Sequence, residues 1–574
     1  MEWIKSIITL FNKKQRFTVV ILILLGIGTA FLDTLSSYII LPFIYAVIDQ
    51  GSINNGSMRT LYDVMGCSSN DEFVIRLALV IAGLYFFVAV YKIFQAFLTA
   101  QFRNSTRHFL ARQVFSKTIY SSYEEITHIN SAEIQRLISS DINRVNAIVV
   151  QLINIITALL TSFSLIGVLW FLDKRITIFA GTVIILVIFL INRPITSRVK
   201  KIGNVITETN TKMVKIIQQF FGGYKTIIAC GRQGSIDRKF LKESYKNSNA
   251  YLKASTLEAI PMHLSQGLIM SAIFIYMAVV ALYGGSLTAM LPTLATFALA
   301  AMKLIPLVGR VSSSFVAVKV DIPAINSVKS FMDSNVGYDV NRTDNLVEER
   351  VALNKEIVLQ NVSFAFNNAE AELFKNVSIC IPANTSVAFI GPTGAGKTTL
   401  ADIIIGLYKP QKGKVLADGK DIYNNRKWWA SQIGYITQRI YLIDDTIRAN
   451  VAYECDDDPD DEKIWKCLKD ACIDDYVRSL PDGLDTICGE NGVRFSGGQQ
   501  QRLGIARALY TNPSVLVFDE ATSALDVDTE SEIVQSIQNL SGKKTLIIIA
   551  HRLSTIESCE LKYRIDEKGV RIVN

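Results

Sequence analysis

The chain has 574 residues, enough for several domains, and 50% of them are apolar, with a mean hydropathy of +0.28. This composition excludes a protein that faces water on all sides. Residues 1–340 hold 32 of the 59 lysines and arginines and 18 of the 52 acidic residues, so they carry +14 and the remainder −7. Because the basic part is also the apolar part, its charges fit loops beside anionic lipid headgroups better than a nucleic-acid surface.

The N-terminal segment MEWIKSIITLFNKKQR precedes an apolar run that is too long for a signal-peptide core and lacks a small-residue cleavage site. We expect this segment to be retained in the cytoplasm. The eight cysteines are scattered, with no CxxC pair and no histidine cluster beside them. This pattern argues against a disulfide framework or a zinc site.

Six apolar stretches are each long enough to cross a bilayer, which takes about 20 helical residues. They are residues 17–47, 77–101, 147–172, 176–196, 258–284 and 288–312. Basic residues precede the first stretch and fill the connection that follows the second, whereas the loop between these two stretches is rich in acidic residues. This asymmetry predicts that both termini face the cytoplasm.

Two connections, 102–146 and 197–257, are long and polar but keep apolar residues at helical spacing. Solvated linkers are the alternative interpretation. Structureless loops of about 40 residues are uncommon, so we expect long helices that protrude into the cytoplasm with a short turn at each tip.

Beyond the last apolar stretch the composition changes to a soluble α/β pattern, in which strand-like runs alternate with glycine-containing turns and amphipathic helices. The sequence therefore predicts a multidomain membrane protein. Residues 1–335 would form an all-α six-helix transmembrane domain, 336–354 a linker, and 355–574 an α/β P-loop ATPase domain.

The stretch SVAFIGPTGAGKTTL has the pattern of a strand, a glycine loop and a helix. Gly391, Gly394 and Gly396 let backbone N–H groups turn inward around phosphates. Lys397 would reach the β- and γ-phosphates, and Thr398 would present its hydroxyl to Mg²⁺ at the helix N-terminus. A motif of this length can arise by chance, but its position directly after an apolar strand indicates a nucleotide site.

Two motifs further along the chain fit the same chemistry. PSVLVFDE is a buried-strand pattern that ends in Asp519, which would hold Mg²⁺, and Glu520, which would polarise the attacking water. A purely structural carboxylate pair is the alternative. In RFSGGQQQRLGIARAL, Ser496 and the glycines after it open a helix and offer a second anion-binding N-terminus. One ATP cannot use both helix ends if they lie far apart in one domain.

Together these motifs resemble those of the ATP-binding cassette (ABC) family, whose exporters fuse a membrane domain to a nucleotide domain and sandwich each nucleotide between two subunits. The resemblance implies nucleotide contacts from an aromatic position, the phosphate loop, the signature motif and the SALD motif, namely Phe366, Gly391, Pro392, Thr393, Gly394, Ala395, Gly396, Lys397, Thr398, Thr399, Ser496, Gly497, Gly498, Gln499 and Asp526.

The same resemblance implies Mg²⁺ ligation by Thr398, Gln438 and Asp519, and catalytic roles for Glu520, Gln438 and the switch histidine His551. An isolated histidine is more often structural, but His551 follows an apolar strand and stands in order with the other motifs. The CGENG segment also resembles the cross-subunit contact loop of exporters.

Two positions depart from the family pattern. Phe495 stands where the signature usually has Leu, and Phe366 lacks the tyrosine hydroxyl. Neither change removes a catalytic group, so the resemblance implies ATP hydrolysis at both composite sites. A single chain cannot form the sandwich, so we expect a homodimer with a central cavity, and coupling contacts at turns near Tyr123–Ser131 and Gln219–Tyr224.

Among the charged residues inside the apolar stretches, the candidates for a functional role are Asp33, Lys92, Lys303 and Arg310. Lys303 and Arg310 are nearly two helical turns apart, so they project from one face about 10 Å apart along the axis. That face suits an extended anion such as a diphosphate. Alternatively, Arg310 reaches the inner headgroups and Lys303 or Lys92 pairs with Asp33. By residue count Asp33 lies deeper from the cytoplasm than Lys92, which argues against that particular pair.

The final span and the ending KTLIIIAHRLSTIESCELKYRI resemble bacterial lipid-linked oligosaccharide flippases, which serve protein glycosylation. The resemblance implies ATP-driven movement of a polyprenyl-diphosphate-linked glycan across the cytoplasmic (inner) membrane by alternating access, with Lys303, Arg310 and Lys92 at the substrate. The two lysines stand where arginine is expected, which removes the bidentate fork that matches a phosphate.

Other functions remain open at this point. An exporter of lipid A-like lipids or of hydrophobic drugs would use the same ATPase. A nucleotide-gated channel or a regulatory membrane subunit would tolerate loss of the catalytic base, and the presence of Glu520 together with His551 argues against both.

Overall fold

The computed structural model describes residues 2–48, 56–172, 174–282, 291–334, 351–367, 371–453, 458–519, 534–535, 537–549, 556–566 and 569–573. These residues form two compact units, one of Met1–Ser121 with His128–Asp339 and one of Ser122–Thr127 with Val340–Asn574. The linker expected at 336–354 falls mostly outside the described residues and stays a prediction.

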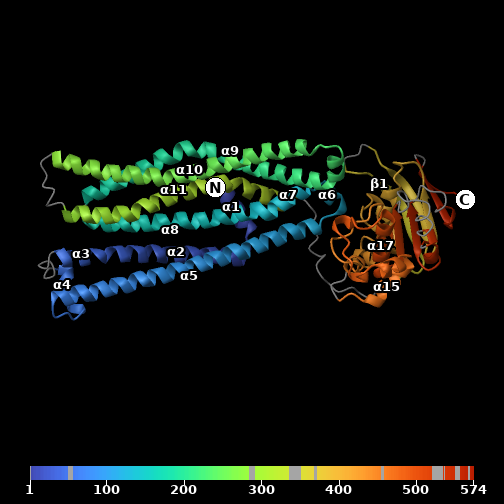
Figure 1. Ribbon diagram of the computed structural model, residues 1–574, viewed down its shortest axis with the longest axis horizontal. Coiled ribbons are helices and arrows are strands. Elements are labelled where there is room, and N and C mark those ends of the chain that lie inside the picture. Colours follow the sequence, from blue (N-terminus) through green and yellow to red (C-terminus); the bar gives the residue numbers. More distant parts are fainter. Residues whose placement is uncertain are drawn as a thin grey trace. The chain divides into compact units, whose positions relative to one another are not determined.

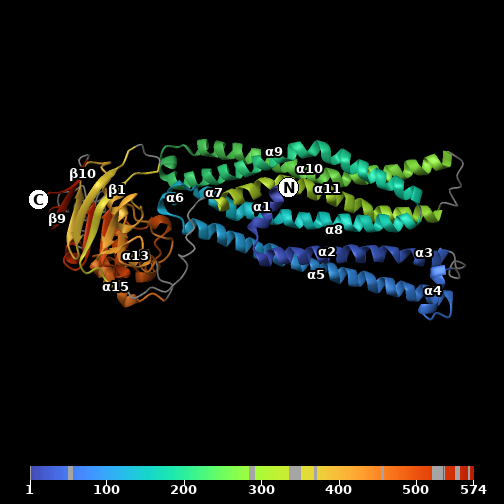
Figure 2. The same cartoon turned by 180° about the vertical axis from the view of Figure 1, so that it is seen from behind.

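The first unit is entirely helical where it is described. Its elements are α1 (Glu2–Leu10), α2 (Lys13–Tyr38), α3 (Ile40–Ile48), α4 (Gly56–Val64), α5 (Asn70–Ile119), α7 (Ser131–Arg136), the π-helical turn η2 (Leu137–Asp141), α8 (Ile142–Leu172), α9 (Lys174–Ala229), α10 (Gln233–Leu282) and α11 (Leu291–Asp333). The long helices run side by side, with α2 and α3 along α5, and α8 to α11 in a second group (Figures 1 and 2).

All six apolar stretches are helical wherever the structure describes them. The first is divided into α2 and α3 at Ile39, and each of the other five falls in one long helix. Three described segments are long and apolar enough to cross a membrane by length and composition alone, namely Lys13–Ser36, Asn70–Ile119 and Ser131–Gly167. Residues 173 and 283–290, which lie between predicted spans, are outside the described residues.

Three helices are much longer than a membrane span. α5 has 50 residues, α9 has 56 and α10 has 50, and 50 residues of helix extend about 75 Å. The expectation of long polar helical extensions therefore agrees with this unit. At the turn expected at Gln219–Tyr224, the backbone leaves helical geometry at Gly223 (φ −133°, ψ 20°), so two helical segments of α9 meet there at a kink, and a hydrogen-bonded turn follows at Cys230–Arg232. The coupling role of this segment stays a prediction.

A buried ionic network joins the polar ends of α8, α9 and α11. The Arg144 guanidinium contacts the Asp321 carboxylate at 2.7 Å and donates hydrogen bonds to the Thr207 hydroxyl and the Val320 carbonyl, each at 2.8 Å. Next to it, Arg136 contacts the buried Asp141 carboxylate at 2.6 Å. Charges that are buried in this way are tolerated because each one has an opposite charge or a dipole against it.

α2 packs closely against α5. An added Cβ at Gly28 would lie 2.3 Å from the Tyr91 hydroxyl, so a larger residue there would displace the Tyr91 side chain. The Tyr91 hydroxyl donates a hydrogen bond to the Leu25 carbonyl at 3.0 Å, and the Thr29 hydroxyl donates one to the Gln95 side-chain carbonyl at 2.7 Å. The two helices are thus joined by polar contacts within otherwise apolar sequence.

The second unit contains two sheets. The four-stranded antiparallel sheet has the order β2 (Phe374–Pro382), β1 (Glu356–Phe364), β4 (Lys412–Ala417) and β5 (Lys420–Asp421). The six-stranded sheet has the order β10 (Gly569–Val573), β9 (Leu561–Asp566), β3 (Ser386–Ile390), β8 (Thr545–Ile549), β7 (Val515–Asp519) and β6 (Ile433–Ile436), parallel except for β10.

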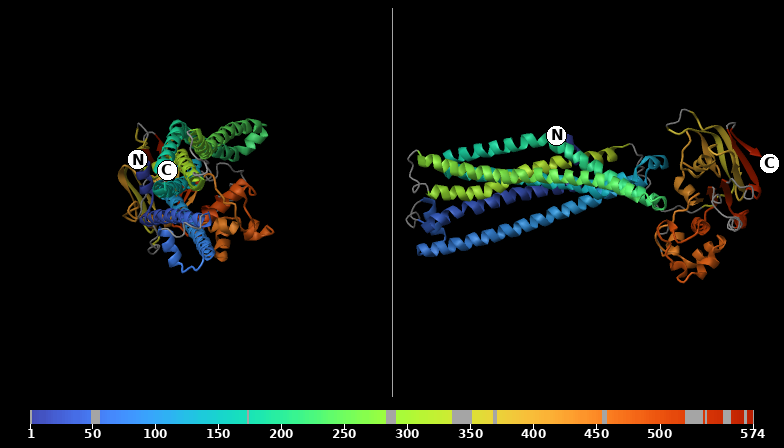
Figure 3. Two further views of the ribbon diagram at one scale, coloured as in Figure 1. Left: turned by 90° about the vertical axis from the view of Figure 1, so that its left-hand side faces the viewer. Right: turned by 45° about the horizontal axis from the view of Figure 1, so that its top comes forward.

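The helices of this unit are α6 (Tyr123–His128), α12 (Lys397–Ile405), α13 (Arg426–Ser431), α14 (Ile447–Val451), α15 (Asp461–Asp470), α16 (Asp474–Ser479) and α17 (Gly497–Tyr510). Two short 3₁₀ turns, η4 (Gly483–Asp485) and η5 (Glu490–Gly492), precede α17. Figure 3 shows the strands, in yellow and red, beside the orange helices of the same unit.

The six-stranded sheet separates two hydrophobic cores. Successive strand residues point to opposite faces. In β3, Phe389 joins the core that contains α12 and Ala388 joins the core that contains α17. The same alternation holds along β7, where Val517 lies in the first core and Phe518 in the second. α12 and α17 therefore cover opposite faces of one sheet.

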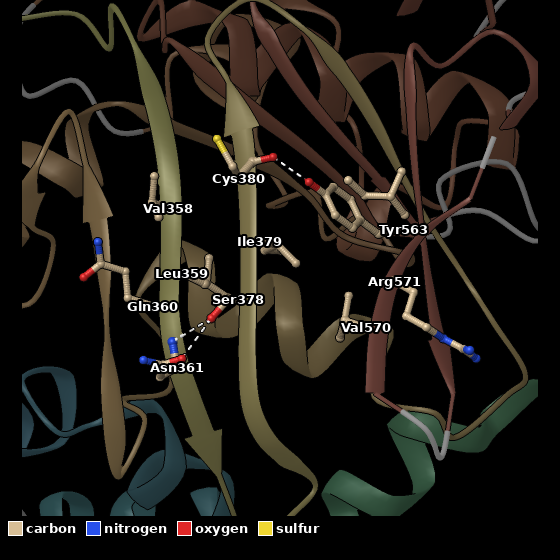
Figure 4. A pocket seen from close by; sticks show the side chains of 11 residues that line it. Val358, Leu359, Gln360, Asn361, Ser378, Ile379, Cys380, Tyr563, Val570 and Arg571 are labelled. Carbon is tan, nitrogen blue, oxygen red and sulfur yellow. Dashed lines mark hydrogen bonds between the residues drawn. The ribbon is translucent and has the colours of Figure 1, made fainter.

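The edge strands β2 and β10 border a hollow of about 730 Å³ (Figure 4). The Tyr563 hydroxyl of β9 donates a hydrogen bond to the Cys380 carbonyl of β2 at 2.6 Å, which ties the two sheets together. None of the residues expected to contact nucleotide lines this hollow.

Arg144→Met is predicted to destabilise the helical unit strongly. It would leave the carboxylates of Asp141 and Asp321 buried without this cation, and breaking such a pair costs about 3–5 kcal/mol. Thermal unfolding of the purified full chain in detergent measures the effect. Lys212→Met is the control because its ion pair with Glu208 is exposed, so no measurable change is expected. Equal destabilisation by both variants would contradict the assignment.

Candidate functional site

The phosphate loop follows the buried strand β3 and ends at α12. Gly391 passes so close to β9 that an added Cβ would lie 2.1 Å from the Ile565 carbonyl oxygen. Gly396 caps α12 with φ at +95°, in the left-handed region that favours glycine. The loop geometry therefore requires glycine at both ends, as expected for a backbone that wraps around phosphates.

Lys397 is buried, and its ammonium group points back over the loop. It donates hydrogen bonds to the carbonyls of Gly391 at 2.9 Å and Pro392 at 3.0 Å. The Thr398 hydroxyl in the next position donates to the Asp519 carboxylate at 3.1 Å. The structure thus brings together two of the three residues that the sequence assigns to Mg²⁺, Thr398 from the start of α12 and Asp519 from the end of β7.

Parallel pairing explains this convergence. β3, β8, β7 and β6 are neighbours in register, so their carboxyl ends meet at one edge of the sheet. Ile436 of β6 is paired with Phe518 of β7, and Gln438 and Asp519 follow these two residues closely. Gln438 is exposed at this edge. Ligand binding at the carboxyl ends of strands is the general pattern of open α/β sheets.

Two residues at this edge were missed in the sequence. The Tyr435 hydroxyl donates a hydrogen bond to the second Asp519 oxygen at 3.3 Å. Asp402, one turn after Thr398 on α12, is buried, and burial together with the nearby Asp519 carboxylate raises its pKa to about 7. Asp402 was detectable only as a polar residue at a core-facing helix position.

The aromatic position expected to stack on adenine lies beside two other rings. The Phe366 ring is 5.1 Å from Phe364 and 5.5 Å from Tyr408, and the side chain is 38% exposed, which leaves one part of the ring accessible. Tyr408 also contacts the ring of Tyr123 at 5.3 Å. Tyr123 lies in α6, within the segment that belongs to this unit, and in the first of the two expected coupling turns.

The signature motif opens α17 as expected. Ser496 is the N-cap, and it forms a reciprocal capping box with Gln499. Gly497 and Gly498 form the first turn, where backbone N–H groups have no partner within the helix. Phe495, the departure from the usual Leu, is buried and packs on Tyr476, so it fills a core position as leucine would.

Three assigned residues, Glu520, Asp526 and His551, lie outside the described residues, and their roles stay predictions. The remaining phosphate-loop residues, Thr393, Gly394, Ala395 and Thr399, lie in the loop or in the first turn of α12.

A cavity of about 410 Å³ lies among α2, α5, α8 and α11 of the helical unit, and it is lined by Lys92 and Arg310. Arg103, one of the basic residues in the connection after the second apolar stretch, lines it as well. The Lys92 ammonium contacts the Asp33 carboxylate at 2.7 Å, so the prediction that these two residues do not pair is wrong. The apolar run does not mark the end of the helix, because α5 continues to Ile119. The depth of Lys92 relative to Asp33 therefore cannot be counted from the end of that run. The side chain of Lys303 lies outside the described residues.

The fold and the site define a membrane protein with a phosphate-loop ATPase. A family model described as ABC transporter matches residues 374–523, and one described as ABC transporter transmembrane region matches residues 12–302. The chain belongs to the ABC transporter family. It is a type I exporter half-transporter with fused membrane and ATPase domains, and it couples ATP binding and hydrolysis to transport.

Curated relatives resemble most of the chain. An ATP-dependent lipid A-core flippase of Syntrophus aciditrophicus is 31% identical over 74% of this chain and 70% of its own length. A multidrug resistance ABC transporter ATP-binding and permease protein of Lactococcus lactis is 29% identical over 86% of this chain and 82% of its own length. A bacterial Atm1-family ABC exporter with ATP bound matches 97% of this chain and 95% of that chain with a TM-score of 0.75 at 22% identity, which supports the fold.

Asp402→Asn is predicted to change the pH dependence of stability. The folded-state pKa of Asp402, about 7, lies above the ordinary value of 3.8. Stability from the protonated carboxyl is therefore fully present below the ordinary value and is lost as the pH rises through 7. Asparagine cannot ionise, so the variant should be more stable than the wild type at pH 8, by about 2 kcal/mol after allowance for screening.

Thermal unfolding of the full chain without nucleotide, at pH 5.5 and pH 8, measures this difference. Asp475→Asn, at an exposed position on α16, is the control and should follow the wild-type profile. An Asp402→Asn profile parallel to that of the wild type would rule out this account of Asp402.

Proposed function

We propose that the protein is an ATP-driven flippase for an amphipathic lipid with an anionic phosphate-bearing headgroup. The observation that carries the proposal is the cavity among the apolar helices, which is lined by Lys92, Arg103 and Arg310 and by the single carboxylate of Asp33. A cation inside a span costs about 2.5–3.5 kcal/mol on insertion scales. A water-filled path that serves an anion offsets this cost.

The favoured substrate within this class is a polyprenyl-diphosphate-linked oligosaccharide, as the resemblance of the final span implies. Lys303, Arg310 and Lys92 would contact its diphosphate. The relatives named lipid A-core flippase favour a second candidate, a lipid A-like lipid, which is also anionic and amphipathic. A cavity with an excess of cations disfavours hydrophobic cationic drugs.

The working form would be a homodimer in the bacterial inner membrane, with the nucleotide unit in the cytoplasm. The separation of α12 and α17 by the six-stranded sheet supports this form. Each layer on a sheet adds about 10 Å, so one nucleotide cannot span both faces of a single unit. The phosphate loop of one copy would meet the signature helix of the other.

Hydrolysis would follow from the groups at the sheet edge. Thr398, Gln438 and Asp519 would hold Mg²⁺, which neutralises charge on the phosphates, and Glu520 would polarise the attacking water. Phe366 would stack on adenine, Asp526 would contact the nucleotide, and His551 would contact the γ-phosphate. ATP can shift the helices toward the closed dimer only by the difference between its affinities for the closed and open forms. Hydrolysis removes the bound ATP and would reset the cycle.

Glu520→Gln is predicted to bind ATP but to hydrolyse it at least 10²-fold more slowly, because the amide cannot accept a proton from water. Measurements of steady-state phosphate release and of radiolabelled ATP binding separate the two effects. Glu557→Gln, an exposed position on the same unit, should keep the wild-type rate. Undiminished hydrolysis by Glu520→Gln would mean that another group activates the water.

Transport is tested in liposomes that contain the purified protein, ATP and one labelled lipid at a time. We expect ATP-dependent movement of a polyprenyl-diphosphate-linked oligosaccharide, and no movement with Glu520→Gln. Movement of lipid A alone would select the second candidate. Movement of a quaternary ammonium drug, with neither anionic lipid moved, would overturn the proposal.

A further inference from the structure

The cavity among α2, α5, α8 and α11 has an ordered polar wall. On α5 its lining residues include Lys92, Gln95, Thr99 and Arg103, a spacing of three or four residues that keeps them on one helix face. Lys92 and Arg103 are eleven residues apart, about 16 Å along the axis. These four residues therefore form a polar track along α5, with Lys92 at one end and Arg103 at the other. The chain direction places Arg103 nearer the polar extension of α5.

The cations of this track are not equivalent. Lys92 contacts the Asp33 carboxylate of α2 at 2.7 Å. Arg103 and Arg310 form no ion pair with any residue that the structure describes, although both line the same cavity. Two charges of the cavity are thus available to an incoming anion, and a third is held by a carboxylate of the protein itself.

The Lys92–Asp33 pair is open to exchange. The Lys92 side chain is 48% exposed and that of Asp33 is 23% exposed, so the pair borders the cavity and is not locked in a core. Partly exposed ion pairs contribute little net stability, because water solvates the separated charges. A phosphate in the cavity therefore competes with Asp33 for Lys92 on comparable terms.

We propose that Asp33 is a built-in competitor of the substrate headgroup. An anionic headgroup binds Arg103 and Arg310 first, and it takes Lys92 only when it displaces the Asp33 carboxylate. This inference rests on the proposed function and adds a specificity residue to it. A headgroup with a single charge is satisfied by the two arginines, whereas a diphosphate has the charge and length to displace Asp33. The carboxylate therefore selects for the more highly charged headgroup.

The test uses three short-chain probes with the same hydrocarbon chain: farnesyl diphosphate, farnesyl monophosphate and farnesol. Equilibrium binding of each probe is measured to the full-length protein in phosphatidylcholine nanodiscs. Asp33→Asn should bind farnesyl diphosphate about fivefold more tightly than the wild type, the gain expected when a partly exposed ion pair no longer competes. Binding of farnesol should not change.

A mutant cycle separates competition from a structural role. Lys92→Gln removes a cation and keeps the negative charge of Asp33 in the cavity, so it should weaken farnesyl diphosphate binding. The double variant D33N/K92Q removes both charges and should bind close to the wild-type level. Glu208→Gln, in an exposed ion pair of the same unit, is the control for loss of a carboxylate and should have no effect.

Unchanged or weaker binding of farnesyl diphosphate to Asp33→Asn would overturn this inference. If Asp33 only supported the structure, its removal would lower the affinity of the protein for the probe or leave it unchanged. Should Asp33→Asn not be recovered as a folded protein, undiminished binding by Lys92→Gln would overturn it equally.

Failure of the proposed function has a different result. In that case the wild type would bind farnesyl diphosphate no better than farnesol. Arg103→Gln and Arg310→Gln locate the site, because each should weaken diphosphate binding at least about tenfold. Lys319→Gln, on the same helix as Arg310 but away from the cavity lining, should not.

Discussion

The parallel pairing of β3, β8 and β7 is the constraint on which the nucleotide unit depends. It places the carboxyl ends of these strands at one edge, where Thr398 and Asp519 lie 3.1 Å apart although they are 121 residues apart in the chain. The same pairing sends alternate side chains into two cores and so puts α12 and α17 on opposite faces. One arrangement of strands therefore brings the predicted Mg²⁺ ligands together and keeps the signature helix away from them, which is what the proposed two-copy site requires.

The helical unit handles charge in two different ways. Around Arg144 the charges are buried and each has a fixed partner, which holds the polar ends of α8, α9 and α11 together. Around Arg103 and Arg310 the charges border a cavity and are accessible. Burial with a partner gives rigidity, and exposure without an ion pair gives a surface on which an anion can bind. A transporter needs both rigid helices that transmit motion and an accessible cavity that binds the substrate.

Much of this architecture could be read from the sequence, because it rests on local patterns. The apolar stretches, the glycine loop and the apolar strand that ends in Asp519 each carry their signal within about 20 residues. The roles of Asp402 and Tyr435 could not be read, since they depend on the packing of α12 and β6 against β7. Arg103 was missed because its apolar stretch ends before it, whereas the helix does not. The Lys92–Asp33 pair was misjudged for the same reason, because the end of the apolar stretch is not the end of α5.

The position of the Lys397 ammonium has a consequence for the timing of the cycle. By donating to the carbonyls of Gly391 and Pro392, the side chain fixes the curvature of the loop with the protein's own groups. The entropy of ordering the loop is then lost when the chain folds and not each time a nucleotide arrives. If a nucleotide binds here as proposed, its phosphates would replace these two carbonyls as the hydrogen-bond acceptors of Lys397. Ordering of the loop would then add little cost to ATP binding, and the motions of whole helices would be left as the slow steps.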